Sequence, residues 1–219
     1  MSTTGADDRS AGPAAGIVDA TWLAAIAGWL PRRRWFAGKH LTVRAVTADA
    51  AVPISLGGTR LSDTVVLIAV RVAFDGAPDQ RYAVPVASVS MHRTGLTADA
   101  GQAIARLDDD RLLVDAMAVP DTAALVVAAA FRSDVHRAGG GAVRGHPRRA
   151  RLVAHPSIIR PLSVEQSNSS VLVGGTHIAK LVRRLEPGPN PDAELPEHLA
   201  AARDAMSRVS EDQKPKSEH

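Results

Sequence analysis

The sequence predicts an α+β protein, with an antiparallel sheet and accompanying helices followed by a smaller domain of short strands. Three observations support this fold class: strand-type runs are joined by short turns, helical periodicity occurs near the N-terminus, and the pattern changes to short strands after about residue 150. Hydrophobic residues make up 45% of the 219 positions and charged residues 22%. This balance is typical of a globular protein that buries a substantial core.

A helix is expected directly after Asp19, whose carboxylate can cap the first turn. Apolar residues then recur at helical spacing until Pro31, which ends the pattern. Residues 1–16 are small and polar, so we expect a flexible leader there. The periodic residues are Val18, Trp22, Ile26, Trp29 and Leu30.

Strands are expected next, and the second and third of them should form a hairpin around the turn signal of residues 75–79. Two Ala-, Leu- and Val-rich segments then favour helices. Gly139–Gly141 and the basic residues after it indicate a linker. Three short strands follow this linker, with Gly174 and Gly175 as a turn between the last two. The expected strands are 41–46, 65–74, 81–86, 158–164, 169–173 and 177–183, and the expected helices are 102–119 and 122–131.

These patterns predict four parts: the leader at 1–16, a first domain at 17–150, a second at 151–209 and a polar tail at 210–219.

Composition excludes several kinds of chemistry. The chain has no cysteine, which removes disulfides, thiolate metal sites and a cysteine nucleophile, and it favours the cytoplasm. A net charge of +3 and 3% aromatic residues predict no nucleic-acid partner, and no apolar run has membrane-spanning length. The eight histidines show no metal-ligand spacing, and Asp108–Asp110 is expected to be a solvated turn.

The residues with the clearest chemical potential lie in the second domain. The polar segment Glu165–Ser170 could present backbone amides and hydroxyls to an anion. In the strand that follows, alternation groups Lys180 with Ile178 and Val182, so its ammonium is expected to lie among apolar neighbours and to pair with Glu194. An anion-binding loop, a strand lysine and a helix glutamate, in this order, are typical of the nucleotide-binding half of a kinase-type lobe. The competing interpretation places Lys180 on the solvated face of an edge strand.

Residues 164–170, 178–184 and 187–195, together with Trp29–Pro31 and Arg34–Lys39, closely resemble the actinobacterial maltokinases, in which an N-terminal cap domain precedes a kinase N-lobe. Related aminosugar kinases share this cap, so the resemblance leaves the sugar open.

The resemblance implies a sugar kinase that uses ATP and magnesium to phosphorylate maltose in glycogen and trehalose metabolism. In that family pattern the phosphate loop comprises Gln166, Ser167, Asn168, Ser169 and Ser170, Lys180 binds ATP phosphates, and Glu194 pairs with Lys180. The family's His-Gly-Asp catalytic loop and later magnesium-binding aspartate have no counterpart in this sequence, so no catalytic or metal-binding residue is assigned.

Two functional hypotheses follow. The first is a maltokinase-like transferase truncated after the N-lobe, inactive alone, with weak ATP binding and a separately encoded catalytic lobe as partner. The alternative is a noncatalytic interaction or regulatory protein whose cap engages a sugar kinase or a glycogen or trehalose enzyme. In either case the apolar residues Leu199, Met206 and Val209 are expected to favour self-association.

Overall fold

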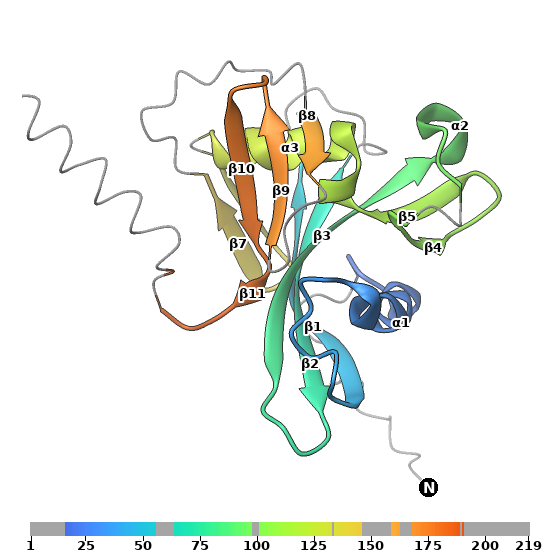
Figure 1. Cartoon of the computed structure of the whole chain (residues 1–219), viewed down its shortest axis with the longest axis vertical. Helices are drawn as coiled ribbons and strands as arrows, with labels where there is room; N and C mark the ends of the chain where they lie inside the picture. Colours follow the sequence, from blue (N-terminus) through green and yellow to red (C-terminus); the bar gives the residue numbers. More distant parts are fainter. Residues whose placement is uncertain are drawn as a thin grey trace, which may run out of the picture. The chain divides into compact units, whose positions relative to one another are not determined.

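The computed structural model describes residues 16–55, 64–97, 101–132, 134–145, 159–162, 168–188 and 190. The chain divides into a compact unit that ends at Leu185 and a second unit that begins at Glu186. All strands and helices below belong to the first unit (Figure 1).

The described strands form three antiparallel sheets. The largest has the order β1-β2-β3-β5-β4, with β11 also paired to β3; the second has the order β10-β9-β8; the third is the hairpin β6-β7. The strands are β1 Val43–Ile54, β2 Val65–Phe74, β3 Gln80–Ser90, β4 Ala103–Arg106, β5 Arg111–Asp115, β6 Val135–Ala138, β7 Gly141–Arg144, β8 Ile159–Leu162, β9 Asn168–Val173, β10 His177–Val182 and β11 Arg184–Leu185. The helices are α1 Ala20–Trp29, η1 Leu30–Arg32, α2 Met91–Thr94, η3 Ala116–Ala118 and α3 Pro120–Ala130.

The predicted first helix is confirmed as α1. The Asp19 carboxylate accepts a 2.8 Å hydrogen bond from the backbone N–H of Trp22, which satisfies one donor of the first turn. Pro31 does not stop the helical path at once, because it lies in the short η1 helix that continues it. Ile26, Trp29 and Leu30 are buried against the large sheet.

The hairpin expected around residues 75–79 is confirmed as β2 and β3, and β1 extends further toward the C-terminus than predicted. Both faces of this sheet carry apolar residues. Ile68 and Val70 of β2 pack in the cluster that contains α1, whereas Val65 packs in the cluster that contains the side chains of α3. The strands are therefore covered by a helix on each face, and α3 also contacts β8 and β9 of the three-stranded sheet.

The prediction of a helix over 102–119 is wrong, since this segment forms β4, β5 and η3. The Asp108 carboxylate accepts hydrogen bonds from the backbone N–H groups of Asp110 and Arg111, at 2.9 and 2.8 Å, and so closes a turn between the two strands. Leu112 and Leu113 are buried on opposite faces, which hides the alternation that marks a strand. The solvated turn expected at Asp108–Asp110 is confirmed, and the second helix is confirmed as α3.

Gly139–Gly141 was expected to be a linker, but Gly139 and Gly140 form the turn of the β6-β7 hairpin and Gly141 begins β7. Gly139 and Gly140 have φ angles of +49° and +79°, which glycine adopts without steric cost. The hairpin lies against β1, where the backbone N–H of Ala51 donates a 3.1 Å hydrogen bond to Gly139. The predicted domain boundary near residue 150 falls within residues 146–158, outside the described residues.

The three short strands predicted after the linker are confirmed as β8, β9 and β10. Residues 174–176 form the turn between β9 and β10, and Gly174 and Gly175 both have positive φ. Residues 1–15 of the predicted leader (1–16), the predicted tail and the apolar residues Leu199, Met206 and Val209 lie outside the described residues. No helix in the described part of the chain is long and apolar enough to cross a membrane.

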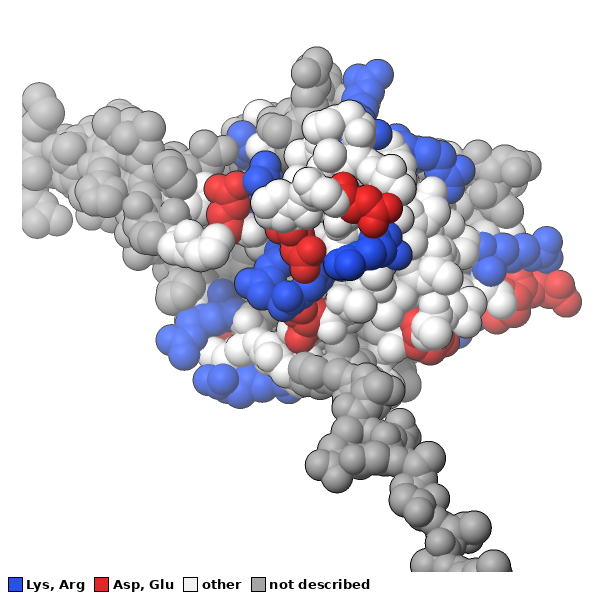
Figure 2. Space-filling view, turned by 90° about the horizontal axis from the view of Figure 1, so that it is seen from below, with Lys and Arg blue, Asp and Glu red and all other residues white. Residues whose placement is uncertain are grey.

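Charges of both signs are interspersed on the face shown in Figure 2. Charged side chains also pair across strands of the large sheet: the Asp49 carboxylate of β1 lies 2.8 Å from Nε of Arg71 in β2 and 2.8 Å from Nε of Arg81 in β3. Because these side chains remain partly exposed, each pair contributes little to stability.

Gly145 provides a test of the packing between β7 and the end of α3. A Cβ atom at this position would collide with the carbonyl oxygens of Arg132 and Ala129. We expect Gly145→Ala to lower the free energy of unfolding by about 1–3 kcal/mol in urea titrations. The matched control is Gly28→Ala in α1, where an added Cβ meets nothing and should raise the free energy of unfolding by about 0.5–1 kcal/mol. Equal effects of the two substitutions would contradict this packing.

Candidate functional site

Lys180 and Ser170 are paired directly across the antiparallel strands β10 and β9. Directly opposite residues in such a pair lie on the same face with Cβ atoms about 5 Å apart. Asn168, two residues before Ser170, is on this face as well. The structure therefore brings the predicted lysine together with two of the predicted phosphate-loop residues.

The Ser170 side chain has unused hydrogen-bonding capacity. Ser170 is only 2% exposed, and its hydroxyl oxygen is buried without a hydrogen-bond partner among the described residues. A buried hydroxyl without a partner costs free energy, so such groups are uncommon and point to a ligand or solvent contact.

The expectation that Lys180 lies among apolar neighbours is wrong, because its side chain is exposed. The alternation assigned the right residues to each face, but the three-stranded sheet packs toward α3 with the face that carries Ala179 and Leu181. Lys180 shares the other face with Ile178, which is 64% exposed. Lys180 thus lies on the exposed face of β10, as the competing interpretation placed it.

Ser169 lies on the opposite face from Lys180. Its hydroxyl accepts a 2.9 Å hydrogen bond from Nε of Arg183 and is 2.7 Å from Nη2 of the same residue. The side chain of Ser169 is therefore engaged inside the protein and does not share the Lys180 face. Gln166, Ser167 and Glu194 lie outside the described residues, so the pairing of Lys180 with Glu194 stays a prediction.

The sequence interpretation missed Arg183, which is fully buried. Its Nη2 atom lies 2.9 and 2.7 Å from the two carboxylate oxygens of Asp115, and its Nη1 atom lies 3.4 Å from the carbonyl oxygen of Ala83. Its guanidinium group also stacks on Trp35, with the central carbon 4.7 Å from the ring centroid. This one side chain joins β9 to the large sheet.

Asp115 is held in place by the end of β5. Its Oδ1 atom accepts a 3.1 Å hydrogen bond from the backbone N–H of Met117 and so caps the η3 helix while it binds Arg183. The residue is only 6% exposed. The sequence did contain a signal for this buried pair, because Asp115 directly follows the apolar run 112–114. A charged residue at the end of a buried strand usually has a partner.

The main chain reinforces this junction. Arg183 accepts a 2.7 Å hydrogen bond at its carbonyl oxygen from the backbone N–H of Ala83, and Arg184 then pairs with Tyr82 as β11 joins β3. The chain thus passes from the three-stranded sheet into the large sheet at Arg183.

The segment Arg34–Lys39 builds the wall against which Arg183 packs. Trp35 contacts the rings of Trp29 and Tyr82, with centroids 5.6 and 5.8 Å apart. Lys39 closes the segment through a 2.8 Å hydrogen bond from Nζ to the carbonyl oxygen of Arg34. The lysine therefore has a structural role in this turn.

Gly38, in the same segment, has no room for a side chain because a Cβ atom would overlap the rings of Phe74 and Phe36.

Residues 29–118 match the family model described as the maltokinase N-terminal cap domain. The chain contains a maltokinase N-terminal cap domain. This finding confirms the resemblance for the N-terminal part of the sequence. Trp35 and Asp115 lie within the cap domain, whereas Ser170, Lys180 and Arg183 lie beyond the matched residues.

The described residues contain no group of three or more His, Asp or Glu side chains arranged to hold a metal ion.

The buried ion pair of Arg183 and Asp115 predicts a large loss of stability when the negative charge of Asp115 is removed. Asp115→Asn keeps an oxygen that can accept from Met117, but it leaves the Arg183 guanidinium buried without a counter-charge. We expect the free energy of unfolding in urea to fall by about 3–5 kcal/mol. The matched control is Asp134→Asn, which removes an exposed ion pair with Arg132. It should lower the free energy of unfolding by less than about 1 kcal/mol. A loss of stability at Asp115 as small as that at Asp134 would contradict a structural role for the pair.

Proposed function

We propose that this chain forms the cap and the nucleotide-contacting sheet of a maltokinase-like sugar kinase. Such an enzyme transfers a phosphoryl group from ATP to maltose or a related sugar in glycogen or trehalose metabolism. The match of residues 29–118 to the maltokinase N-terminal cap domain carries this proposal. The order of polar segment, strand lysine and helix glutamate after the cap supports it.

The face that carries Lys180 fits phosphate chemically. The exposed ammonium of Lys180 can form charge-assisted hydrogen bonds with phosphate oxygens, and the Ser170 hydroxyl beside it has no partner among the described residues. Asn168 lies two residues away on the same face. In the proposal these three residues contact ATP, which supplies the transferable phosphoryl group.

The cap supports this face through Arg183. The Ser169 side chain points to the other side of β9 and accepts a hydrogen bond from the Arg183 guanidinium. The same guanidinium donates a hydrogen bond to the Asp115 carboxylate of the cap. The position of β9 relative to the cap is therefore set by buried polar contacts with defined geometry. In the proposal the cap holds the nucleotide-contacting strands in place and makes no contact with ATP.

A second function is favoured by one observation: Ile178 is largely exposed beside Lys180 on β10, which is an edge strand of the described three-stranded sheet. An exposed apolar side chain at a sheet edge is suited to contact with another polypeptide. In this alternative the chain is a noncatalytic partner of a sugar kinase or of a glycogen or trehalose enzyme.

Titration with ATP, followed by amide chemical shifts in NMR spectra, tests the nucleotide proposal. We expect shifts in β9 and β10, and binding that weakens as salt rises because phosphate contacts dominate it. Lys180→Ala should weaken binding by about tenfold or more, since it removes a charge-assisted hydrogen bond. Lys39→Ala is the matched control, because it removes a lysine that hydrogen-bonds only within the cap, and it should leave the affinity unchanged.

Shifts that map only to residues 29–118, or equal affinities of the wild type and Lys180→Ala, would overturn the nucleotide proposal. That result would favour the noncatalytic alternative.

A further inference from the structure

A second region of the described chain, separate from the Lys180 face, has the features of a ligand site. It is a hollow of about 640 Å³ between α2, the adjoining ends of β3 and β5, and the first turns of α3. Pockets of about 300–1,000 Å³ commonly hold small molecules. Its polar lining includes Ser88, Ser90, Arg93, Asp110, Arg111 and Asp121.

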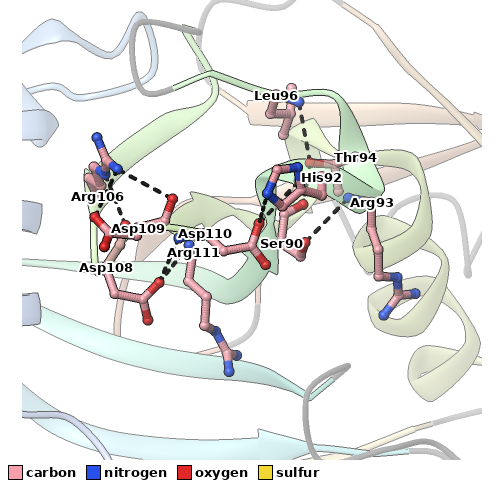
Figure 3. Close-up of polar contacts among 10 residues, drawn as sticks. All are labelled: Ser90, His92, Arg93, Thr94, Leu96, Arg106, Asp108, Asp109, Asp110 and Arg111. Carbon is pink, nitrogen blue, oxygen red and sulfur yellow. Dashed lines mark hydrogen bonds and ion pairs between the residues drawn. The ribbon is translucent and has the colours of Figure 1, made fainter.

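Arg111 is held in a fixed position with donors to spare. Its Nε atom donates a 2.9 Å hydrogen bond to the Ser88 hydroxyl, and its side chain is partly buried. Neither of its two Nη atoms has a hydrogen-bond acceptor among the described residues. In Figure 3 the guanidinium groups of Arg111 and Arg93 extend toward the same side, away from the contacts around Asp108. The anchored guanidinium thus offers both amino groups to a ligand.

Asp110 supplies a fixed negative charge beside Arg111 (Figure 3). A hydrogen bond from the Ser90 hydroxyl, and then one from the backbone N–H of His92, lower the pKa of Asp110 below its ordinary value. The carboxylate is therefore ionised at neutral pH. Ser90 is itself fixed, because its oxygen accepts a 3.3 Å hydrogen bond from the backbone N–H of Arg93.

The wall formed by α3 supplies a second carboxylate and an apolar surface. Asp121 is exposed in the first turn of α3, and it has no hydrogen-bond or ion-pair partner among the described residues. Val89, Val119 and Leu125 provide apolar surface in the same hollow. In this first hollow two arginines and two aspartates balance one another, so its lining favours neither an anion nor a cation.

A neighbouring hollow of about 590 Å³ shares Ser88 and Arg111 with the first. It adds the partly exposed indole of Trp22 and the carboxylate of Asp108, whose Oδ1 atom already accepts two backbone hydrogen bonds. It also adds the hydroxyl oxygen of Thr64, which is buried without a hydrogen-bond partner among the described residues. An indole surface beside polar groups can stack against the C–H face of a sugar ring. Arg111 thus lies where two hollows meet.

We propose that these joined hollows bind a neutral saccharide, with Arg111 at the centre of the site. Sugar hydroxyl groups both donate and accept hydrogen bonds, so they match the fixed guanidinium donors and carboxylate acceptors without adding a net charge. The apolar residues and Trp22 contact the C–H faces of the sugar rings. The site goes beyond the proposed nucleotide contacts, because none of its residues lies on the Lys180 face.

NMR titration of the full chain with maltose as the neutral probe tests this site. We expect shifts at the amides of Ser88, Ser90 and Asp121, and an affinity that does not depend on salt. Arg111→Gln should weaken binding by about tenfold or more, and Asp121→Asn by about threefold or more, because each removes charge-assisted hydrogen bonds. Arg106→Gln and Asp109→Asn are matched controls on the neighbouring turn and should leave the affinity unchanged, since neither residue lines the hollows.

Several outcomes would overturn the saccharide site. One is the absence of shifts up to about 100 mM maltose, a range that covers dissociation constants well above 1 mM. Another is tighter, salt-sensitive binding of glucose 1-phosphate than of maltose, which would indicate an anion site. Asp121 is exposed and its substitution leaves the fold intact, so unchanged binding in Asp121→Asn would count against the site even if Arg111→Gln unfolds. Lys180→Ala should leave maltose binding unchanged, because Lys180 lines neither hollow. The test of the saccharide site is therefore independent of the test of the nucleotide proposal.

Discussion

The buried contact between Arg183 and Asp115 is the interaction on which the arrangement of this unit depends. Removing both charged groups from water costs desolvation free energy, and the Coulombic attraction of one ion pair alone does not offset this cost. Here the cost is offset by hydrogen bonds to both carboxylate oxygens and to Ser169, and by stacking on Trp35. Asp115 and Trp35 lie in the cap domain, whereas Ser169 and Arg183 belong to the strands that follow it.

This contact gives the cap a physical role in the proposed function. β9 carries Ser169 on one face and Ser170 on the other, so an arginine that fixes Ser169 also fixes where Ser170 and its cross-strand neighbour Lys180 lie. A phosphate-contacting face benefits from such support, because donors that are already in position lose less entropy when the ligand binds. The hollow around Arg111 follows the same principle, since Ser88 anchors a guanidinium that still has donors to offer.

The sequence predicted those features that depend on local signals. Asp19 marked the start of α1, the turn residues 75–79 marked the β2-β3 hairpin, and the pair Gly174 and Gly175 marked the turn before β10. Features that depend on tertiary packing were not predicted correctly. Alternation grouped the side chains of β10 but could not say which face α3 covers, so Lys180 was assigned to the wrong environment. The partner of Arg183 lies 68 residues away, and no local pattern joins the two.

Hydrogen exchange of the backbone amides in Asp115→Asn tests most directly whether this contact fastens the two sheets together. If it does, amides of β9 and β10 lose protection together with those of η3, although the substituted residue lies in neither strand. The α1 helix, which contributes to the core cluster on the other face of the large sheet, should keep its protection. Unchanged protection in β9 and β10, with loss confined to η3, would contradict the account, because it would show that the strands are held without Arg183 and Asp115.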